Sequence, residues 1–211
     1  MKKKSANIFL GKKILVYGLG RTGISSYEFL KKKALVYLFD DNPETVRKIR
    51  KKCISLKELK RIKFDKIIIS PGIDISNCKL SNFLKKNFLK IYTDLDIFYS
   101  FFNNDCFTIT GTNGKSTTCK LLHEVLLDQK FDTKLVGNIG NPILSSKNIK
   151  KKTIFVVEAS SYQLEYSKIF RSRFAVILNI SPDHIERHKT INKYVKAKFS
   201  LIYNQRKGNF A

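Results

Sequence analysis

A glycine-rich segment near the middle of the chain has the residue types that bind a nucleoside triphosphate. Its residues are Gly111, Thr112, Asn113, Gly114, Lys115, Ser116 and Thr117. The segment lies between an apolar, strand-like run, Cys106–Thr110, and a helical stretch, Lys115–Asp128. Backbone N–H groups of such a loop can cradle phosphates, Lys115 can reach the β- and γ-phosphates, and the Ser116 hydroxyl can ligate Mg²⁺. The strict P-loop pattern needs a glycine where Ile109 stands, but the Gly-Lys-Ser-Thr ending still predicts a phosphate-binding loop.

Acidic and histidine side chains follow two other strand-like runs. Glu158 ends the run Thr153–Val157, and Asp183 and His184 follow Phe174–Ile180. Because the carboxyl ends of parallel strands meet at one edge of a sheet, we expect these groups near the phosphate loop. A carboxylate there predicts a Mg²⁺ ligand, directly or through water. A lone histidine is commonly structural, but its position beside an acid at this edge favours a functional reading for His184.

A second glycine loop, Gly18-Leu19-Gly20-Arg21-Thr22-Gly23, fits the pattern G-x-G-x-x-G. It follows the strand-like run Lys13–Tyr17, and such a loop lets the backbone approach a diphosphate at a helix N-terminus. Asp40 ends the next strand-like run, where an acid can hold a ribose, so a nicotinamide cofactor is one reading. A tight turn without a ligand is the other. The segment Ser70–Ile73 is expected at the same sheet edge.

Short apolar runs alternate with amphipathic stretches along the whole chain, which predicts an α/β fold with mostly parallel sheets. The expected strands are Lys13–Tyr17, Ala34–Phe39, Lys66–Ser70, Lys90–Tyr92, Cys106–Thr110, Thr133–Val136, Thr153–Val157 and Phe174–Ile180. The expected helices are Thr22–Lys32, Pro43–Lys51, Leu80–Asn87, Asp94–Phe101, Lys115–Asp128 and Asn192–Asn204. The polar segment Asn103-Asn104-Asp105 is the best boundary, so we expect domains at 1–103 and 104–211.

The composition describes a globular chain with a strong positive charge. It has 211 residues, 43% of them apolar, and 41 basic against 17 acidic residues give a net charge of +24. The lysines occur as short runs at 2–4, 31–33, 51–52, 85–86 and 150–152, without one basic stripe or a nucleic-acid-binding motif. We therefore expect solvated lysine-rich faces and no nucleic-acid partner.

No run approaches the length needed to cross a bilayer, and the start of the chain does not read as a signal peptide. The four cysteines are far apart, which favours reduced thiols and a cytoplasmic protein. Membrane insertion is not expected.

Taken together, the motifs resemble the Mur ligases, the ATP-dependent amide-forming enzymes of peptidoglycan precursor synthesis. The resemblance covers essentially the whole chain and is carried by GLGRTG (18–23), SPGI (70–73), GTNGKST (111–117), Gly137–Pro142, EASSYQLE (158–165), NISPDHIERH (179–188) and KYVKAKFSLIY (193–203). Within the family, the segments are most similar to the members that add D-glutamate. The resemblance implies a Rossmann-like N-terminal domain and a P-loop ATPase-type central domain.

The resemblance also implies roles for individual residues. The loop 111–117 is expected to bind ATP, with Lys115, His184 and Lys198 as catalytic residues. Ser116 and Glu158 are expected to serve one Mg²⁺, and His184 the second. Lys198 matches a lysine that the family carries as a carbamate, a metal-bridging anion. Contacts to the UDP-linked substrate are expected from Leu19, Arg21, Thr22, Asp41, Asn42, Asn138 and Ser160.

The implied reaction joins D-glutamate to UDP-N-acetylmuramoyl-L-alanine at the expense of ATP. The substrate carboxylate takes the γ-phosphoryl group, and the amine of D-glutamate displaces phosphate from the acyl phosphate. Such an enzyme serves cell-wall biogenesis, cell shape and cell division, and we expect a monomer. Alternatives are another Mur ligase step or an NAD-binding oxidoreductase. Since the family has three domains, the chain is expected to be a truncated ligase that ends inside the central domain at Ala211 and to be inactive alone.

Overall fold

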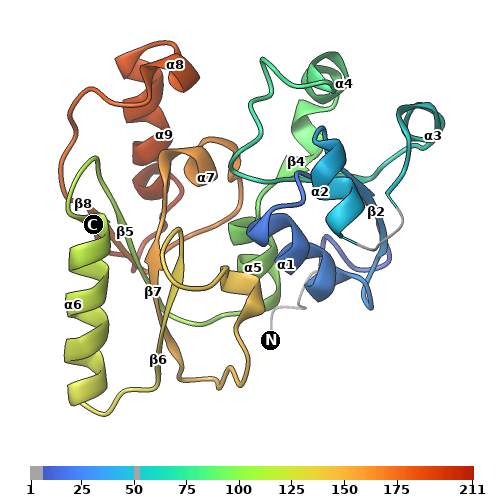
Figure 1. Ribbon diagram of the computed structural model, residues 1–211. Helices are drawn as coiled ribbons and strands as arrows, with labels where there is room; N and C mark the ends of the chain where they lie inside the picture. Colours follow the sequence, from blue (N-terminus) through green and yellow to red (C-terminus); the bar gives the residue numbers. More distant parts are fainter. Residues whose placement is uncertain (1–6, 50–52) are drawn as a thin grey trace. The chain divides into compact units, whose positions relative to one another are not determined.

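The computed structural model describes residues 7–49 and 53–211. The chain forms two compact units, Met1–Phe101 (unit 1) and Phe102–Ala211 (unit 2). Each unit is an α/β layer structure around its own four-stranded sheet, and every strand pairing is parallel (Figure 1). The expected fold class is confirmed.

Unit 1 has the sheet order β2-β1-β3-β4. Its elements are β1 (Lys13–Tyr17), α1 (Arg21–Leu30), β2 (Leu35–Phe39), α2 (Pro43–Lys48), α3 (Leu56–Arg61), β3 (Lys66–Ile69), α4 (Ser81–Lys86), the 3₁₀ turn η1 (Phe88–Lys90), β4 (Ile91–Tyr92) and α5 (Asp94–Phe101). The apolar run of β1 is central and fully buried, as a strand covered on both faces must be. Because β2 and β3 flank β1 on opposite sides, the chain reverses its winding at β1, the place where open α/β sheets bind ligands.

The sequence prediction for unit 1 missed one helix and extended others beyond their observed ends. Helix α3 begins with a capping box, in which Ser55 and Glu58 satisfy each other's backbone N–H groups. The Ser-x-x-Glu spacing was visible in the sequence and is a standard signal of a helix start. The expected helix Pro43–Lys51 is described as far as Lys48, and its expected end at Lys51 lies outside the described residues.

Unit 2 has the sheet order β6-β7-β5-β8. Its elements are β5 (Cys106–Thr110), α6 (Lys115–Asp128), β6 (Thr133–Gly137), the 3₁₀ turn η2 (Ile143–Ser145), β7 (Ile154–Glu158), α7 (Ser161–Tyr166), β8 (Phe174–Ile177), α8 (Ile185–His188) and α9 (Ile191–Tyr203). Helix α6 packs on β5, β6 and β7, whereas α9 packs on α7, α8 and β8 (Figure 1). A core cluster of Ile109, Cys119 and Val156 joins α6 to the sheet.

Two short helices of unit 2 and the true end of β8 were not expected. Strand β8 ends at Ile177 and not at Ile180, because the chain there turns over the glycine loop and Thr112 N–H donates to the Asn179 carbonyl at 3.1 Å. Helix α7 starts with a capping box between Ser160 and Gln163. Helices of four to six residues carry little periodic pattern, so they are easily missed in a sequence, although α2 and α4, which have six residues each, were predicted.

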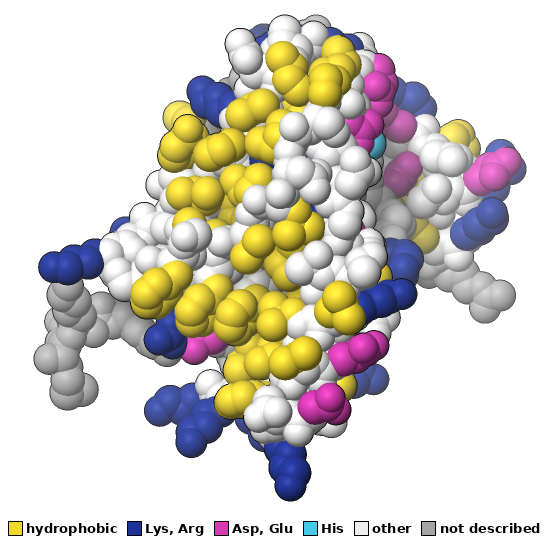
Figure 2. All heavy atoms as spheres, turned by 90° about the vertical axis from the view of Figure 1, so that its left-hand side faces the viewer, with side chains coloured by type: hydrophobic (Ala, Val, Ile, Leu, Met, Phe, Trp, Pro, Cys, Tyr) yellow, Lys and Arg dark blue, Asp and Glu magenta, His cyan; other side chains and the backbone are white. Residues whose placement is uncertain are grey.

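Unit 2 exposes a group of apolar side chains on the face formed by α6 and β8 (Figure 2). Leu121 and Val125 of α6 are 58% and 55% exposed, and Val176 of the edge strand β8 is 36% exposed.

Among the described residues, no helix is long and apolar enough to cross a membrane. Cys106 and Cys119 are buried, and burial raises the pKa of both thiols, so they act as packing residues at neutral pH.

Candidate functional site

The first glycine loop lies at the carboxyl edge of the unit 1 sheet, between β1 and α1. Gly18 has a φ of +89°, and an added Cβ would stand 2.8 Å from Ser70 and Ile73. An added Cβ at Gly23 would stand 1.8 Å from the Gly18 carbonyl oxygen. These two glycines are therefore required by the protein's own packing.

Gly20 differs from the other two glycines of this loop. It is exposed, it has a φ of −68°, and an added Cβ would meet nothing within 4 Å. Packing and backbone conformation give no reason for a glycine here, whereas the close approach of a ligand does. Gly20 is also the residue that precedes helix α1, where N–H groups favour an anion.

The acidic residues at the end of β2 are held by the protein itself. Both Asp40 carboxylate oxygens accept backbone bonds, from Leu19 N–H at 2.6 Å and Asn42 N–H at 2.8 Å. Asp40 thus braces two loops and is not directed at a ribose, which weakens the nicotinamide reading. Asp41 accepts from the Tyr17 hydroxyl at 2.7 Å and from Lys79 N–H at 3.1 Å. Burial, together with the hydrogen bond to Asp41, raises the pKa of Tyr17.

The remaining expected substrate residues of unit 1 differ in burial and in hydrogen bonding. The Leu19 side chain is 3% exposed, and Asn42 caps α2 by accepting from Glu44 N–H at 2.9 Å. Arg21 is exposed and Thr22 half-buried, both in the first turn of α1. The loop therefore presents these two side chains and the exposed Gly20 to a ligand.

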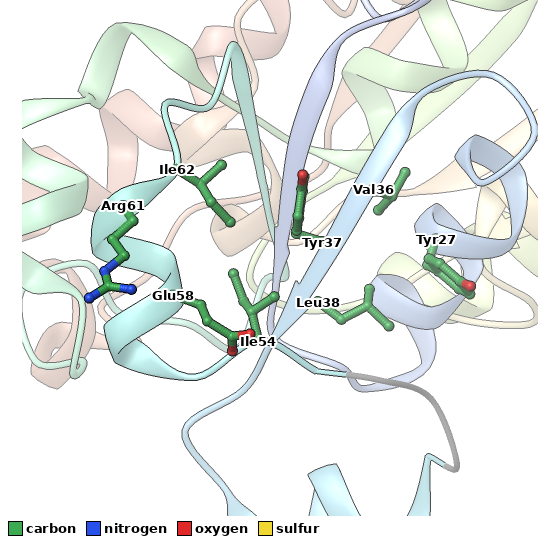
Figure 3. A pocket seen from close by; sticks show the side chains of 8 residues that line it. All are labelled: Tyr27, Val36, Tyr37, Leu38, Ile54, Glu58, Arg61 and Ile62. Atoms are coloured by element: carbon green, nitrogen blue, oxygen red, sulfur yellow. The ribbon is translucent and has the colours of Figure 1, made fainter.

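A cavity of about 500 Å³ in unit 1 lies beside β2 and α3 (Figure 3). Its lining side chains are Tyr27, Val36, Tyr37, Leu38, Ile54, Glu58, Arg61 and Ile62. None of them is an expected site residue. The cavity follows the outer side of the edge strand and is therefore separate from the glycine loop at the strand ends.

The candidate catalytic centre lies at the carboxyl edge of the unit 2 sheet, where β5 and β7 end side by side. Glu158 is 1% exposed, and its two carboxylate oxygens accept from the Ser116 hydroxyl at 2.7 Å and from the Asn138 side chain at 2.8 Å. The Asn138 backbone N–H also donates to the Glu158 carbonyl at 2.9 Å. Three of the expected site residues, which are far apart in the sequence, thus meet at one buried carboxylate.

The loop that precedes α6 has a conformation that demands glycine. Gly114 has a φ of +81° and ends the loop in a left-handed conformation directly before Lys115. The Lys115 ammonium donates to the Thr112 carbonyl at 2.7 Å and so folds over its own loop. Ser116 and Thr117 follow in the first turn of α6, and both are exposed.

Lys198 is the most informative side chain of this site. Its position on a lysine-rich helix reads as an ordinary surface residue, yet it is 2% exposed. Its ammonium donates to the Gly111 carbonyl at 2.7 Å and lies 4.6 Å from the centre of the Tyr194 ring. Burial and the charge of Lys115 lower its pKa from 10.5 to about 8. Amphipathic helices bury one stripe, and α9 turns Tyr194 and Lys198, one helical turn apart, toward the glycine loop.

His184 lies at the start of α8 in a left-handed conformation with φ +52°, unusual for a residue with a side chain. Its Nε2 is 3.3 Å from Asp183, whose other carboxylate oxygen accepts the His184 backbone N–H. The ring lies 5.0 Å from the Tyr162 ring. His188, to which no role was assigned, is buried against Tyr162 and bonded to Ser161 at 3.0 Å, a packing role.

Ser160 caps α7 by accepting from Gln163 N–H at 3.2 Å, so its hydroxyl has a structural partner. The sequence reading missed Asn179 and Tyr194, which contact the glycine loop directly. Asn179 lies in the quoted segment 179–188, and Tyr194 precedes Lys198 by four residues, so the only available signals were these positions.

The residues present fit a magnesium ion at one of the two expected positions. Mg²⁺ is usually held by one or two protein oxygens together with water and phosphate oxygens, and Ser116 and Glu158 offer such oxygens. The second expected magnesium position, at His184 and Lys198, does not fit a cation in this state. The Lys198 side chain is an ammonium, and an ammonium cannot ligate a cation. Among the described residues, no group of three or more His, Cys, Asp or Glu side chains could hold a metal.

The chain is similar to known proteins over most of its length. Residues 12–91 match the family "Mur ligase MurD-like, N-terminal domain", and residues 109–211 match "Mur ligase middle domain". The UDP-N-acetylmuramoylalanine–D-glutamate ligase of Rickettsia bellii is 37% identical over 202 residues, which is 92% of this chain and 44% of that protein. The corresponding ligase of Caldicellulosiruptor bescii is 39% identical over 208 residues, covering 92% of this chain and 45% of that protein. The chain thus spans less than half the length of these relatives.

A solved structure agrees at the level of the fold. The UDP-N-acetylmuramate:L-alanyl-gamma-D-glutamyl-meso-diaminopimelate ligase from Neisseria meningitides matches with a TM-score of 0.57 and 17% identity, covering 94% of this chain and 70% of that chain. The resemblance found in the sequence motifs is therefore confirmed. This chain belongs to the Mur ligase family, with a MurD-like N-terminal domain over residues 12–91 and a Mur ligase middle domain over residues 109–211.

Proposed function

We propose that this chain supplies the nucleotide–sugar-binding and ATP-binding parts of a ligase that adds D-glutamate to UDP-N-acetylmuramoyl-L-alanine. The observation that carries the proposal is the meeting of Ser116, Asn138 and Glu158 beside the glycine loop of unit 2. The names of the relatives support the choice of D-glutamate over the amino acids of other Mur ligase steps.

ATP binds with its phosphates at the N-terminus of α6. Residues 114–117 begin this 14-residue helix, and their N–H groups point along its axis toward an anion. The Lys115 ammonium leaves the Thr112 carbonyl and neutralises the γ-phosphate, since a phosphate oxygen is a stronger acceptor than a carbonyl. The whole loop 111–117 belongs to the proposed ATP site, with residues 114–117 facing the phosphates and residues 111–113 supporting them.

Ser116 and Glu158 hold one Mg²⁺ in the proposed site. With the ion bound, the Ser116 hydroxyl and one Glu158 oxygen would be its protein ligands, and Asn138 would keep the other Glu158 oxygen in place. When bound, Mg²⁺ neutralises charge on the phosphates during phosphoryl transfer.

Lys198 is proposed to react with CO₂: its neutral amine bonds to the carbon, one N–H proton is lost to solvent, and a carbamate results. A lysine with a pKa of about 8 is partly neutral at physiological pH, and only the neutral amine attacks CO₂. The carbamate keeps one N–H, which is enough for the bond to the Gly111 carbonyl. It also replaces the cation with an anion, so that Lys198 and His184 can serve a second cation.

Unit 1 binds the UDP portion of the substrate at the first glycine loop. The diphosphate approaches the exposed Gly20 and the first turn of α1, where Arg21 adds a positive charge and Thr22 a hydroxyl. Asp41 and Asn42, after the end of β2, contribute the uracil or ribose side, and Leu19, whose side chain is buried, contributes through its backbone. In unit 2, Asn138 and Ser160 are the proposed contacts near the reacting carboxylate.

The reaction has two steps in this proposal. The substrate carboxylate attacks the γ-phosphorus of ATP and gives an acyl phosphate with release of ADP. The amine of D-glutamate then attacks the acyl carbon, phosphate leaves, and the amine proton passes to a base. ATP and UDP-linked sugars are cytoplasmic metabolites, so the reaction belongs in the cytoplasm of a bacterium, and a monomer without nucleic-acid or membrane partners suffices.

Titration calorimetry tests the proposal on the 211-residue chain. We expect heat of binding for UDP-N-acetylmuramoyl-L-alanine, and for ADP only with Mg²⁺, each with a one-to-one stoichiometry. Tighter binding of NADH than of the UDP-linked substrate would overturn the assignment of unit 1. Absence of nucleotide binding to unit 2, while unit 1 binds its ligand, would overturn the assignment of the phosphate loop alone.

A further inference from the structure

The shape of the phosphate loop is held by the segment 179–181, whose residues have no role in the proposed chemistry. The Asn179 side-chain oxygen accepts from Thr112 N–H at 3.2 Å and from Asn113 N–H at 2.9 Å. Its amide nitrogen donates to the Asn113 carbonyl at 3.1 Å. One side chain thus makes three hydrogen bonds to two consecutive loop residues, a pattern that only a carboxamide can satisfy, because it has both an acceptor and donors.

The same segment holds the loop at a second point. The Thr112 hydroxyl accepts from Ser181 N–H at 3.0 Å and lies 3.0 Å from the Tyr194 hydroxyl, which is buried. The backbone of Thr112 also donates to the Asn179 carbonyl at 3.1 Å. The backbone N–H groups of Thr112 and Asn113 and the Thr112 hydroxyl are therefore all bonded to this segment.

These bonds give the two halves of the loop different roles. The N–H groups of Thr112 and Asn113 are used up by Asn179, whereas those at 114–117 begin α6, where the first N–H groups of a helix have no partner within the helix. Preorganised donors bind an anion more strongly than donors that must first be ordered. Held in this way, the first half of the loop presents the second half to phosphate.

Resting on the proposed ATP function, we propose that Asn179 is a positioning residue that holds the loop 111–114 in its phosphate-binding shape, with Tyr194 as a second support at Thr112. Asn179 does not contact phosphate itself. Because Asp183 and His184 follow in the same segment, Asn179 also ties the phosphate loop to the strand end that carries His184.

The test is nucleotide binding by Asn179→Leu, which has a similar volume and no hydrogen-bonding groups. We expect its affinity for ADP with Mg²⁺ to fall about tenfold or more, and that of Tyr194→Phe about threefold, since three bonds to the loop backbone are lost in one case and one hydroxyl contact in the other. The matched controls are Asn104→Leu, which removes two 2.8 Å bonds to the carbonyls of Lys150 and Thr153 elsewhere in unit 2, and Tyr203→Phe on the exposed side of α9. Both controls should bind ADP like the wild type.

Asn179→Asp and amide hydrogen exchange separate positioning from general stability. Asn179→Asp keeps the acceptor for two N–H groups but brings a negative charge beside the phosphates, so its ADP affinity should recover as the salt concentration rises. In Asn179→Leu, but not in Asn104→Leu, the amides of Thr112 and Asn113 should exchange faster while the core strand β5 stays protected.

The outcomes are distinct. Unchanged ADP affinity and unchanged exchange at Thr112 and Asn113 in folded Asn179→Leu would overturn the positioning role while leaving the proposed function intact. Failure of the wild-type chain to bind ADP would overturn the proposed function and this inference with it. Equal losses of affinity in Asn179→Leu and Asn104→Leu would assign the effect to stability and also overturn the positioning role.

Discussion

The glycine loops of unit 1 and unit 2 occupy equivalent places in their sheets, but the carboxylate beside each loop has different hydrogen-bond partners. Each joins the end of a central parallel strand, β1 or β5, to a helix. In unit 1 the carboxylate on the neighbouring strand, Asp40, is saturated by two backbone N–H groups. In unit 2 the corresponding carboxylate, Glu158, accepts from two side chains, Ser116 and Asn138.

The difference explains what each loop can bind. A carboxylate that is bonded to backbone cannot be released without unfolding its loops, so Asp40 serves structure and leaves recognition to neutral N–H groups. Side-chain donors can rotate away, so Glu158 can exchange the Ser116 hydroxyl for a cation. The buried Lys198 and the loop residue Lys115 place two basic groups at the second loop. This difference agrees with the proposed function, in which unit 1 holds a diphosphate and unit 2 transfers a phosphoryl group.

The largest effect is expected from Gly23→Ala in unit 1. Its new Cβ would lie 1.8 Å from the Gly18 carbonyl oxygen, so β1 and α1 cannot keep their positions. We expect a loss of about 3 kcal/mol or more in the free energy of unfolding of unit 1, measured by urea denaturation. Gly20→Ala is the control: it should change stability by less than about 1 kcal/mol yet weaken binding of the UDP-linked substrate. A stable Gly23→Ala protein would contradict the packing argument.

Lys115→Ala should remove a charge-assisted phosphate contact of unit 2 without unfolding it. Alanine is a good helix former, and the lost bond to Thr112 lies within the loop. We expect the binding free energy of ATP to weaken by about 1.5–3 kcal/mol in calorimetry. Lys120→Ala, on the exposed side of the same helix, should bind ATP normally. Equal affinities of Lys115→Ala and wild type would remove Lys115 from the site.

The pH dependence of stability should report the buried Lys198. Its pKa is about 8 in the folded chain and about 10.5 when unfolded, so between these values the unfolded state binds more protons. The contribution of Lys198 to stability therefore rises as the pH increases from 8 to 10. Relative to Lys198→Met, the wild type should gain on the order of 2 kcal/mol over this interval. A constant difference between the two melting curves would show that Lys198 titrates like a surface lysine.

The smallest effect concerns Asn42, which caps α2 and is also a proposed substrate contact. Asn42→Ala should cost about 1 kcal/mol of stability, because the bond to Glu44 N–H is lost. Asn42→Asp keeps a capping oxygen and should melt like the wild type. If Asn42 also contacts the UDP-linked substrate, both variants should bind it more weakly in calorimetry. Normal binding by Asn42→Asp would leave the residue with its capping role alone.

The sequence by itself determined the alternation of strands and helices, the two glycine loops and the family. These features depend on local chemistry: β-branched apolar runs make buried strands, and glycine marks backbone that other residues cannot adopt. The strands Lys13–Tyr17 and Cys106–Thr110 and the helices Asp94–Phe101 and Lys115–Asp128 were predicted to the residue for the same reason. The short helices α3, α7 and α8 were missed because one or two turns give no periodicity.

Only the tertiary structure decided which polar residues are free for chemistry. Asp40 and Glu158 look alike in sequence, each an acid after an apolar run, and the difference between them lies in partners contributed by distant segments. Lys198 looks like any surface lysine until α9 buries it against Gly111 and Tyr194. Asn179 has no local pattern at all, since its three bonds join residues 66 and 67 positions apart in the chain. Burial and hydrogen bonding are properties of the packed chain, and a linear pattern does not contain them.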